Sequence, residues 1–169
     1  MRSLPITMAV LTELPDQIMK KDLQHIQLAC FSLGDKLFAV DIMRIKEIIL
    51  PQKLTGLPRE SKLLEGVINL RGEVIPVMDM RNRFGMPKAV ERIPGRLLIV
   101  SLQRQMLALA VDDVLEVITV PVGEIKAAPD VIEGIGMEYV LGICFSSERM
   151  FMILDIDSLF GPSEVRQES

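Results

Sequence analysis

LLEGVINLRGEVIPVMDMRNRFG, residues 63–85, is the stretch that decides the fold, because a weaker copy of it recurs as YVLGICFSSERMFMILDIDSLFG at residues 139–161. The two stretches align without a gap at an offset of 76 (85 + 76 = 161). They share glycine, aspartate and phenylalanine-glycine landmarks, which pair Gly66 with Gly142, Asp79 with Asp155, Phe84 with Phe160 and Gly85 with Gly161. Shared landmarks at one fixed spacing indicate a repeated unit.

A second echo lies upstream of this motif. LFAVDIMRIKEII at 37–49 matches MLALAVDDVLEVI at 106–118 at an offset of 69 (49 + 69 = 118). The same two blocks occur in the same order in both halves, which makes chance similarity between apolar strands a poor explanation. The chain is therefore read as an internal duplication.

Short apolar runs with turn signals between them predict a mainly β fold. In the first copy, hairpins are expected at 26–33 with 36–42 and at 66–70 with 73–78, the second joined at Arg71-Gly72. Asp79 is expected to cap a helical turn that Gly85 ends. In the second copy, strands are expected at 97–103, 106–111, 117–122, 140–145 and 150–154.

About five short strands per copy predict two small five-stranded barrels packed side by side, because closure removes the exposed edges of a small sheet. The first barrel is expected at about residues 25–90 and the second at about 95–161, with 86–94 as the linker between them. Residues 1–24 are expected to be an N-terminal tail, since they mix proline, charge and aliphatic residues without a period, and residues 162–169 are expected to be a C-terminal tail. Few helices are expected.

The composition supports an aliphatic core in a soluble protein. Hydrophobic residues make up 49% of the 169 residues but aromatic residues only 4%, with no Trp. The apolar runs are shorter than the roughly 18 residues that a membrane-spanning helix needs, and no leader pattern follows the start. Cys30 and Cys144 lie in separate apolar runs, so they are expected to be buried free thiols. We expect a cytoplasmic protein with no direct membrane insertion.

The charge distribution favours a protein partner over a nucleic acid. The net charge is −4, and residues 105–169 carry three basic and twelve acidic side chains. This acidic half argues against a nucleic acid, which needs clustered Lys and Arg together with aromatic side chains for stacking. The acidic half is either a solvated face or a surface that attracts a basic partner.

Residues suited to catalysis are scarce. The only histidine, His25, stands at the start of the ordered region, and the sequence lacks phosphate-loop, nucleophile-elbow and zinc-protease motifs. Asp112 and Asp113 are adjacent, and neighbours on a strand point to opposite faces, which does not suit shared acid and base work. The sequence predicts no enzyme, no cofactor and no metal site, so function is expected to reside in surfaces.

The stretch GVINLRGEVIPVMDMRNRFG resembles the CheW family of chemosensory coupling proteins, as do FSLGDKLFAVDIMRIKEII, VDDVLEV and ILDIDSLF. The resemblance covers about residues 25–161. It implies a non-catalytic adaptor of two SH3-like barrels around a shared core, which couples chemoreceptors to the histidine kinase CheA. It also implies a receptor-binding groove between the barrels and contacts at the barrel ends with the regulatory domain of the kinase. Association with membrane-anchored receptor arrays and with other CheW copies in rings follows from the same likeness.

By position in these motifs, the resemblance implies that five residues contact receptor or kinase: Ile45, Glu47, Arg71, Val114 and Val117. Each has a structural alternative, since the aliphatic residues also suit a core and Arg71 also suits a solvated hairpin tip. A pairing of Arg71 with Glu47 at the groove rim is our hypothesis. The alternative function is a small β-barrel that binds a small ligand in the cleft between the barrels. Hydrolysis at an unrecognised carboxylate site is a further, less favoured reading.

Overall fold

The computed structural model describes residues 24–56, 63–88, 95–129 and 137–159. The expected tails apart from Gln24, residues 89–94 of the expected linker, and the landmarks Phe160 and Gly161 lie outside these ranges. Within the described ranges, no helix is long and apolar enough to cross a membrane.

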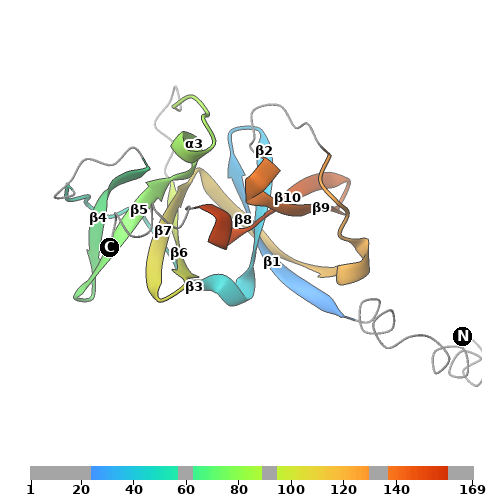
Figure 1. Cartoon of the computed structure of the whole chain (residues 1–169), viewed down its shortest axis with the longest axis horizontal. Coiled ribbons are helices and arrows are strands. Elements are labelled where there is room, and N and C mark those ends of the chain that lie inside the picture. The colour runs from blue at the N-terminus through green and yellow to red at the C-terminus, as the bar shows by residue number, and fades with distance from the viewer. Residues whose placement is uncertain (1–23, 57–62, 89–94, 130–136, 160–169) are drawn as a thin grey trace, which may run out of the picture.

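Two five-stranded sheets lie side by side along the long axis of the molecule (Figure 1). Sheet A has the order β8-β1-β2-β10-β9, with β1 (His25–Leu33), β2 (Lys36–Asp41), β8 (Asp113–Pro121), β9 (Val140–Ser146) and β10 (Arg149–Leu154). Sheet B has the order β3-β6-β7-β5-β4, with β3 (Ile45–Ile49), β4 (Leu64–Leu70), β5 (Glu73–Asp79), β6 (Arg96–Leu102) and β7 (Gln105–Val111). The mainly β architecture of two packed five-stranded sheets is confirmed.

Helical structure in the described residues is limited to single turns. They are α3 (Met80–Arg83) and the 3₁₀ turns η1 (Ile42–Arg44), η2 (Val122–Glu124), η3 (Met137–Tyr139) and η4 (Ile156–Leu159). The Asp79 carboxylate accepts a hydrogen bond from the Arg81 amide at 3.0 Å, as expected of a cap. Gly85, with φ at 69°, ends the turn, because a residue without Cβ adopts this left-handed conformation at little cost.

The strands are exchanged between the two copies. Sheet A combines β1 and β2 of the first copy with β8, β9 and β10 of the second, and sheet B combines β6 and β7 with β3, β4 and β5. The assignment of residues 25–90 and 95–161 to separate barrels is therefore wrong. We expected it because consecutive strands usually pair, whereas here a hairpin from the other copy occupies the middle of each sheet.

Each sheet closes through an isolated bridge. Thr55, on the chain that leaves β3, pairs with Val67 on β4, and Lys126, on the chain that leaves β8, pairs with Ile143 on β9. One edge of each sheet thus continues into a segment that pairs with its other edge. This closure gives the two small barrels that the strand count predicts.

Three apolar clusters form the core. One lies inside each barrel, around Cys30 and Phe151 in sheet A and around Ile68 and Ile75 in sheet B. The third and largest fills the space between the sheets, with residues such as Phe31, Val100 and Leu109. Side chains alternate between the two faces of a strand, so the inner strands contribute to the central cluster from one face and to a barrel cluster from the other. Both faces of these strands are therefore apolar.

A row of aromatic rings crosses the central cluster. Phe31 stacks on Phe38 with centroids 5.5 Å apart, and Phe38 stacks on Phe84 at 5.2 Å. Phe84 also contacts Tyr139 at 5.7 Å. Phe84, a landmark of the opening motif, is thus a packing residue that joins α3 to sheet A.

Candidate protein-binding surface

Arg71 and Glu47 form an ion pair across sheet B. Arg71 Nη1 donates to Glu47 Oε2 at 3.3 Å, and Nη2 donates to Oε1 in a shorter bond. Their side chains are 69% and 35% exposed. The hydrogen bond from Arg71 lowers the pKa of Glu47, so the carboxylate stays charged at neutral pH. The pairing that we hypothesised from the sequence is present.

The turn between β4 and β5 holds Arg71 in place. Arg71 has φ at 52° and Gly72 at 88°, both left-handed. The Asn69 side-chain oxygen accepts a hydrogen bond from the Gly72 amide at 3.0 Å and locks the turn. Beside the ion pair lies a hollow of about 260 Å³, whose lining includes Leu70, Ile75, Ile99 and Met106.

Val114 and Val117 lie on one face of β8 because of a bulge. Val117 stands opposite Ala29 and Val114 opposite Phe31, and the register shifts between these pairs. Residues three apart on a regular strand point to opposite faces of the sheet. Here the bulge inserts Leu115, which has no partner on β1, and the two valines therefore point to the same face. Val117 is 51% exposed, whereas Val114 is half-buried against the central cluster.

Strand β3 repeats this arrangement in sheet B. Ile45 stands opposite Val100 and Ile48 opposite Leu98, with the register shift at Lys46. Val100 and Leu98 both face the central cluster, so Ile45 and Ile48 share that side of sheet B. Ile45 is half-buried against the cluster and Ile48 is 42% exposed. At the offset of 69, Ile48 is the equivalent of Val117.

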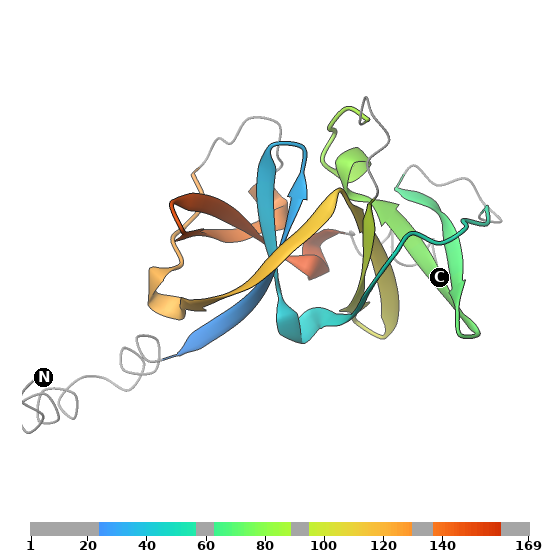
Figure 2. The same cartoon turned by 180° about the vertical axis from the view of Figure 1, so that it is seen from behind.

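These four aliphatic side chains define what we call the edge-strand face, which consists of Ile45, Ile48, Val114 and Val117. Figure 2 shows β3 and β8 on the same side of the molecule, both running outward from the junction of the two sheets. Glu47 does not belong to this face, since it stands opposite Ile99, which points into barrel B. The predicted residues thus separate into an aliphatic face and a polar pair beside it.

Sequence reasoning missed two features of this surface. Ile48 was not selected, although its alignment with Val117 would have identified it. The second copy also carries an ion pair, in which Arg149 donates to Glu116 on β8, the equivalent of Glu47. The glutamate that RIKEI and DVLEV share is the sequence feature that could have predicted this second pair. Its partner is harder to predict, because Arg149 stands two residues beyond the position that aligns with Arg71.

The metal-ligating side chains of the residues that the structure describes do not form a cluster. Within them, no group of three or more His, Cys, Asp or Glu side chains has the geometry to hold a metal ion. Cys30 and Cys144 are buried free thiols, as expected. Burial, together with the nearby Cys144, raises the pKa of Cys30 to about 12, which keeps the thiol protonated.

The small-ligand alternative is not supported. Hollows of about 520 and 470 Å³ are lined by residues of sheet B and its connections, such as Glu65 and Asp79 in the first and Pro76 and Gln105 in the second. Neither is formed by facing residues of the two sheets.

The chain is similar to known proteins in sequence. A family model described as CheW-like domain matches residues 27–164. The chain is 32% identical to "Chemotaxis protein CheW" of Treponema pallidum, covering 85% of this chain and 87% of that protein. It is also 32% identical to the protein of the same name from Rhizobium meliloti, over 83% and 90%.

A solved structure shares the fold. The scaffolding protein TtCheW from Thermoanaerobacter tengcongensis superimposes with a TM-score of 0.75 at 33% sequence identity, covering 82% of this chain and 89% of that one. The family model spans all ten strands except the first two residues of β1. By sequence and by fold, the chain belongs to the CheW family.

Proposed function

We propose that this protein is a non-catalytic adaptor that couples chemoreceptors to a CheA histidine kinase in a bacterial chemosensory array. The edge-strand face is the observation that carries the proposal. An amphipathic helix binds where exposed aliphatic side chains line a shallow surface, and Ile48 and Val117 are exposed on equivalent strands of the two sheets. The receptor tip is the helical partner that this face accepts.

The kinase is proposed to bind elsewhere, through its regulatory domain and the ends of the barrels. Two separate surfaces allow both partners to bind at once, as coupling requires. Such an adaptor works in the cytoplasm at arrays of membrane-anchored receptors, which it reaches through its protein partners. Other copies of the chain can join it in rings.

The test measures binding of a receptor-tip fragment and of a kinase regulatory domain in separate titrations. Val117→Asp places a charge on the edge-strand face and is expected to weaken receptor binding by about 1 to 3 kcal/mol, roughly 5- to 150-fold. Kinase binding and thermal stability are expected to stay unchanged, because Val117 is half exposed.

Val74→Asp is the matched control. Val74 is 67% exposed on β5, away from the edge-strand face, so the same charge there is expected to leave receptor binding unchanged. Equal receptor affinity in Val117→Asp and the unmodified protein would contradict the proposal.

A further inference from the structure

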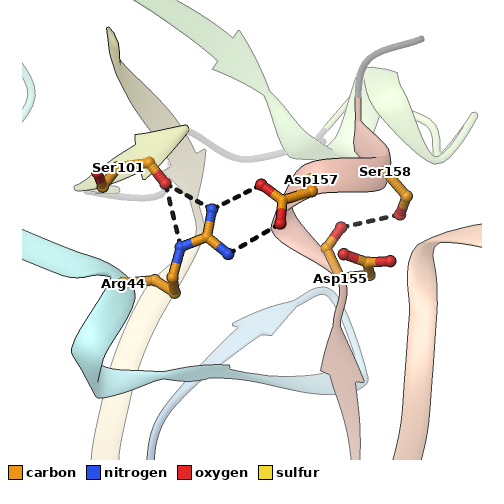
Figure 3. Close-up of polar contacts among 5 residues, drawn as sticks. All are labelled: Arg44, Ser101, Asp155, Asp157 and Ser158. Atoms are coloured by element: carbon orange, nitrogen blue, oxygen red, sulfur yellow. Dashed lines mark hydrogen bonds and ion pairs between the residues drawn. The ribbon is translucent and has the colours of Figure 1, made fainter. Parts of the chain in front are cut away.

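Arg44 joins three separate elements at the junction of the two sheets. It ends η1, the turn that carries the chain from β2 in sheet A to β3 in sheet B. Its Nη2 lies 2.8 Å from Asp157 Oδ1, and its Nη1 lies 3.2 Å from Oδ2 (Figure 3). The Ser101 carbonyl on β6 accepts from Arg44 Nε at 3.2 Å and from Nη2 at 2.7 Å. Asp157 belongs to η4, so one guanidinium ties η1 to β6 and to the turn after β10.

Asp112 joins separate elements at the second point where the chain crosses between the two sheets. It is the single residue between β7 in sheet B and β8 in sheet A. Its carboxylate accepts from Arg81 Nε at 2.9 Å, from Arg81 Nη2 in a shorter bond, and from the Gly34 amide at 2.6 Å. Arg81 also donates to the Pro87 carbonyl at 2.9 Å. The Arg81 and Asp112 side chains are only 14% and 13% exposed.

The two contacts occupy corresponding places in the repeat, offset by one residue at the crossing, and carry reversed charges. Arg81 aligns with Asp157 at the offset of 76, and Arg44 aligns with Asp113, next to Asp112, at the offset of 69. In each contact, the place where one copy crosses between sheets is bound by the helical turn that ends the other copy. Arginine stands on the crossing in one case and on the turn in the other.

Each crossing leads directly into the edge-strand face. Ile45 follows Arg44 without a gap, and Val114 is two residues beyond Asp112. A charged pair with two or more hydrogen bonds fixes direction as well as distance. Loosening either contact frees the start of β3 or β8 to tilt against the central cluster, which moves the aliphatic side chains that follow.

We infer that Arg44–Asp157 and Arg81–Asp112 are positioning contacts that set the angle between the two sheets and so align the edge-strand face for its partner. The part that concerns the partner rests on the proposed function. The part that concerns the angle does not, and the two are measured separately.

The angle is tested on the protein alone. Spin labels are attached through cysteines introduced at Val74 in sheet B and Glu148 in the β9–β10 turn of sheet A, both exposed. The native Cys30 and Cys144 are fully buried and do not compete for the label. Arg44→Ala and Asp157→Ala are each expected to broaden or shift the distance distribution. A distribution identical to that of the unmodified protein overturns the inference.

Arg104→Ala is the control, since Arg104 is an exposed arginine in the β6–β7 turn, and its distribution is expected to stay unchanged. If Arg44→Ala does not fold, Arg44→Lys keeps the charge but loses the paired geometry, and the same broadening is expected of it.

The alignment is tested by receptor-tip affinity. Arg44→Ala and Asp157→Ala are each expected to weaken receptor-tip binding by roughly 2- to 30-fold, which is the range of indirect coupling. The double variant is expected to bind no more weakly than the weaker-binding of the two single variants, because both substitutions remove the same contact. A changed distance distribution with unchanged affinity overturns the positioning role. If the unmodified protein does not bind the receptor tip, the proposed function is contradicted. The spin-label distances then still test whether the contacts set the angle between the sheets.

Discussion

Gly66 and Gly142, equivalent residues of the two copies, each lie against a backbone carbonyl. A Cβ at Gly66 would stand 2.6 Å from the Thr55 oxygen, and one at Gly142 would stand 2.7 Å from the Lys126 oxygen. Thr55 and Lys126 are the residues whose bridges close the two barrels. Gly66 and Gly142 therefore mark the places where the two barrels close.

Gly66→Ala and Gly142→Ala are expected to destabilise the protein by about 1 to 3 kcal/mol each, because the added methyl group forces the closing bridge apart. Gly56→Ala is the control, since a Cβ there meets nothing within 4 Å. Urea unfolding measures all three. A stability of Gly66→Ala equal to that of Gly56→Ala would show that the bridge yields without cost.

Receptor affinity is expected to couple Glu47 and Arg71. If the pair holds the rim of the binding surface, Glu47→Gln and Arg71→Gln each weaken receptor binding, and the double variant binds no more weakly than either. Folding stability is expected to stay unchanged, because the pair is exposed. The same cycle on Glu116 and Arg149 tests whether the second pair contributes equally. Additive losses at Glu47 and Arg71 would mean that the two side chains act independently.

Ile48→Asp is expected to weaken receptor binding as much as Val117→Asp, because the two residues are equivalent and similarly exposed, at 42% and 51%. The expected loss is again about 1 to 3 kcal/mol. Titration of the receptor-tip fragment measures it. A loss in Val117→Asp alone would place the partner on β8 only and remove β3 from the surface.

Acid is expected to release the contact at Asp112. Burial opposes ionisation of this carboxyl, but hydrogen bonds from Arg81 and the Gly34 amide outweigh burial and lower its pKa below the ordinary value of 3.8. The ionised form therefore stabilises the folded state above about pH 4, and this stability is lost as pH falls through the lowered pKa.

Urea unfolding between pH 7 and pH 2 measures this effect. Asp112→Asn is expected to cost about 1.5 to 3 kcal/mol at pH 7 and progressively less below pH 4, where the native carboxyl is also neutral. Asp35→Asn, on the exposed β1–β2 turn, is the control. A constant difference between Asp112→Asn and the unmodified protein across this range would rule out the carboxylate as the source of the stability.

Local features were predictable from the sequence because local rules govern them. Alternating apolar residues and glycine turns located the hairpins, and Asp79 with Gly85 located the helical turn. The motif positions also selected Glu47 and Arg71, which pair in the structure. These features depend on residues a few positions apart or on a likeness to a family.

The remaining features depend on contacts between distant segments. Val117 pairs with Ala29 across 88 positions (117 − 29 = 88), and nothing near either residue specifies the other. The bulges at Lys46 and Leu115 arise only when β3 and β8 meet their partner strands, so alternation alone misplaces the residues beyond them. The contacts of Asp112 could not be predicted for the same reason, because Arg81 and Gly34 lie far from it in sequence.

The exchange of strands has a consequence for the order in which the protein is made. All five strands of sheet B lie between residues 45 and 111, so the ribosome completes that sheet before β8 begins. The β1–β2 hairpin is the first of the ten strands' hairpins to be made, and 113 more residues (154 − 41 = 113) are added before β10 completes sheet A, roughly 6 to 23 s at ordinary elongation rates. During this time, the apolar faces of the hairpin are buried only if they pack against sheet B or bind a chaperone.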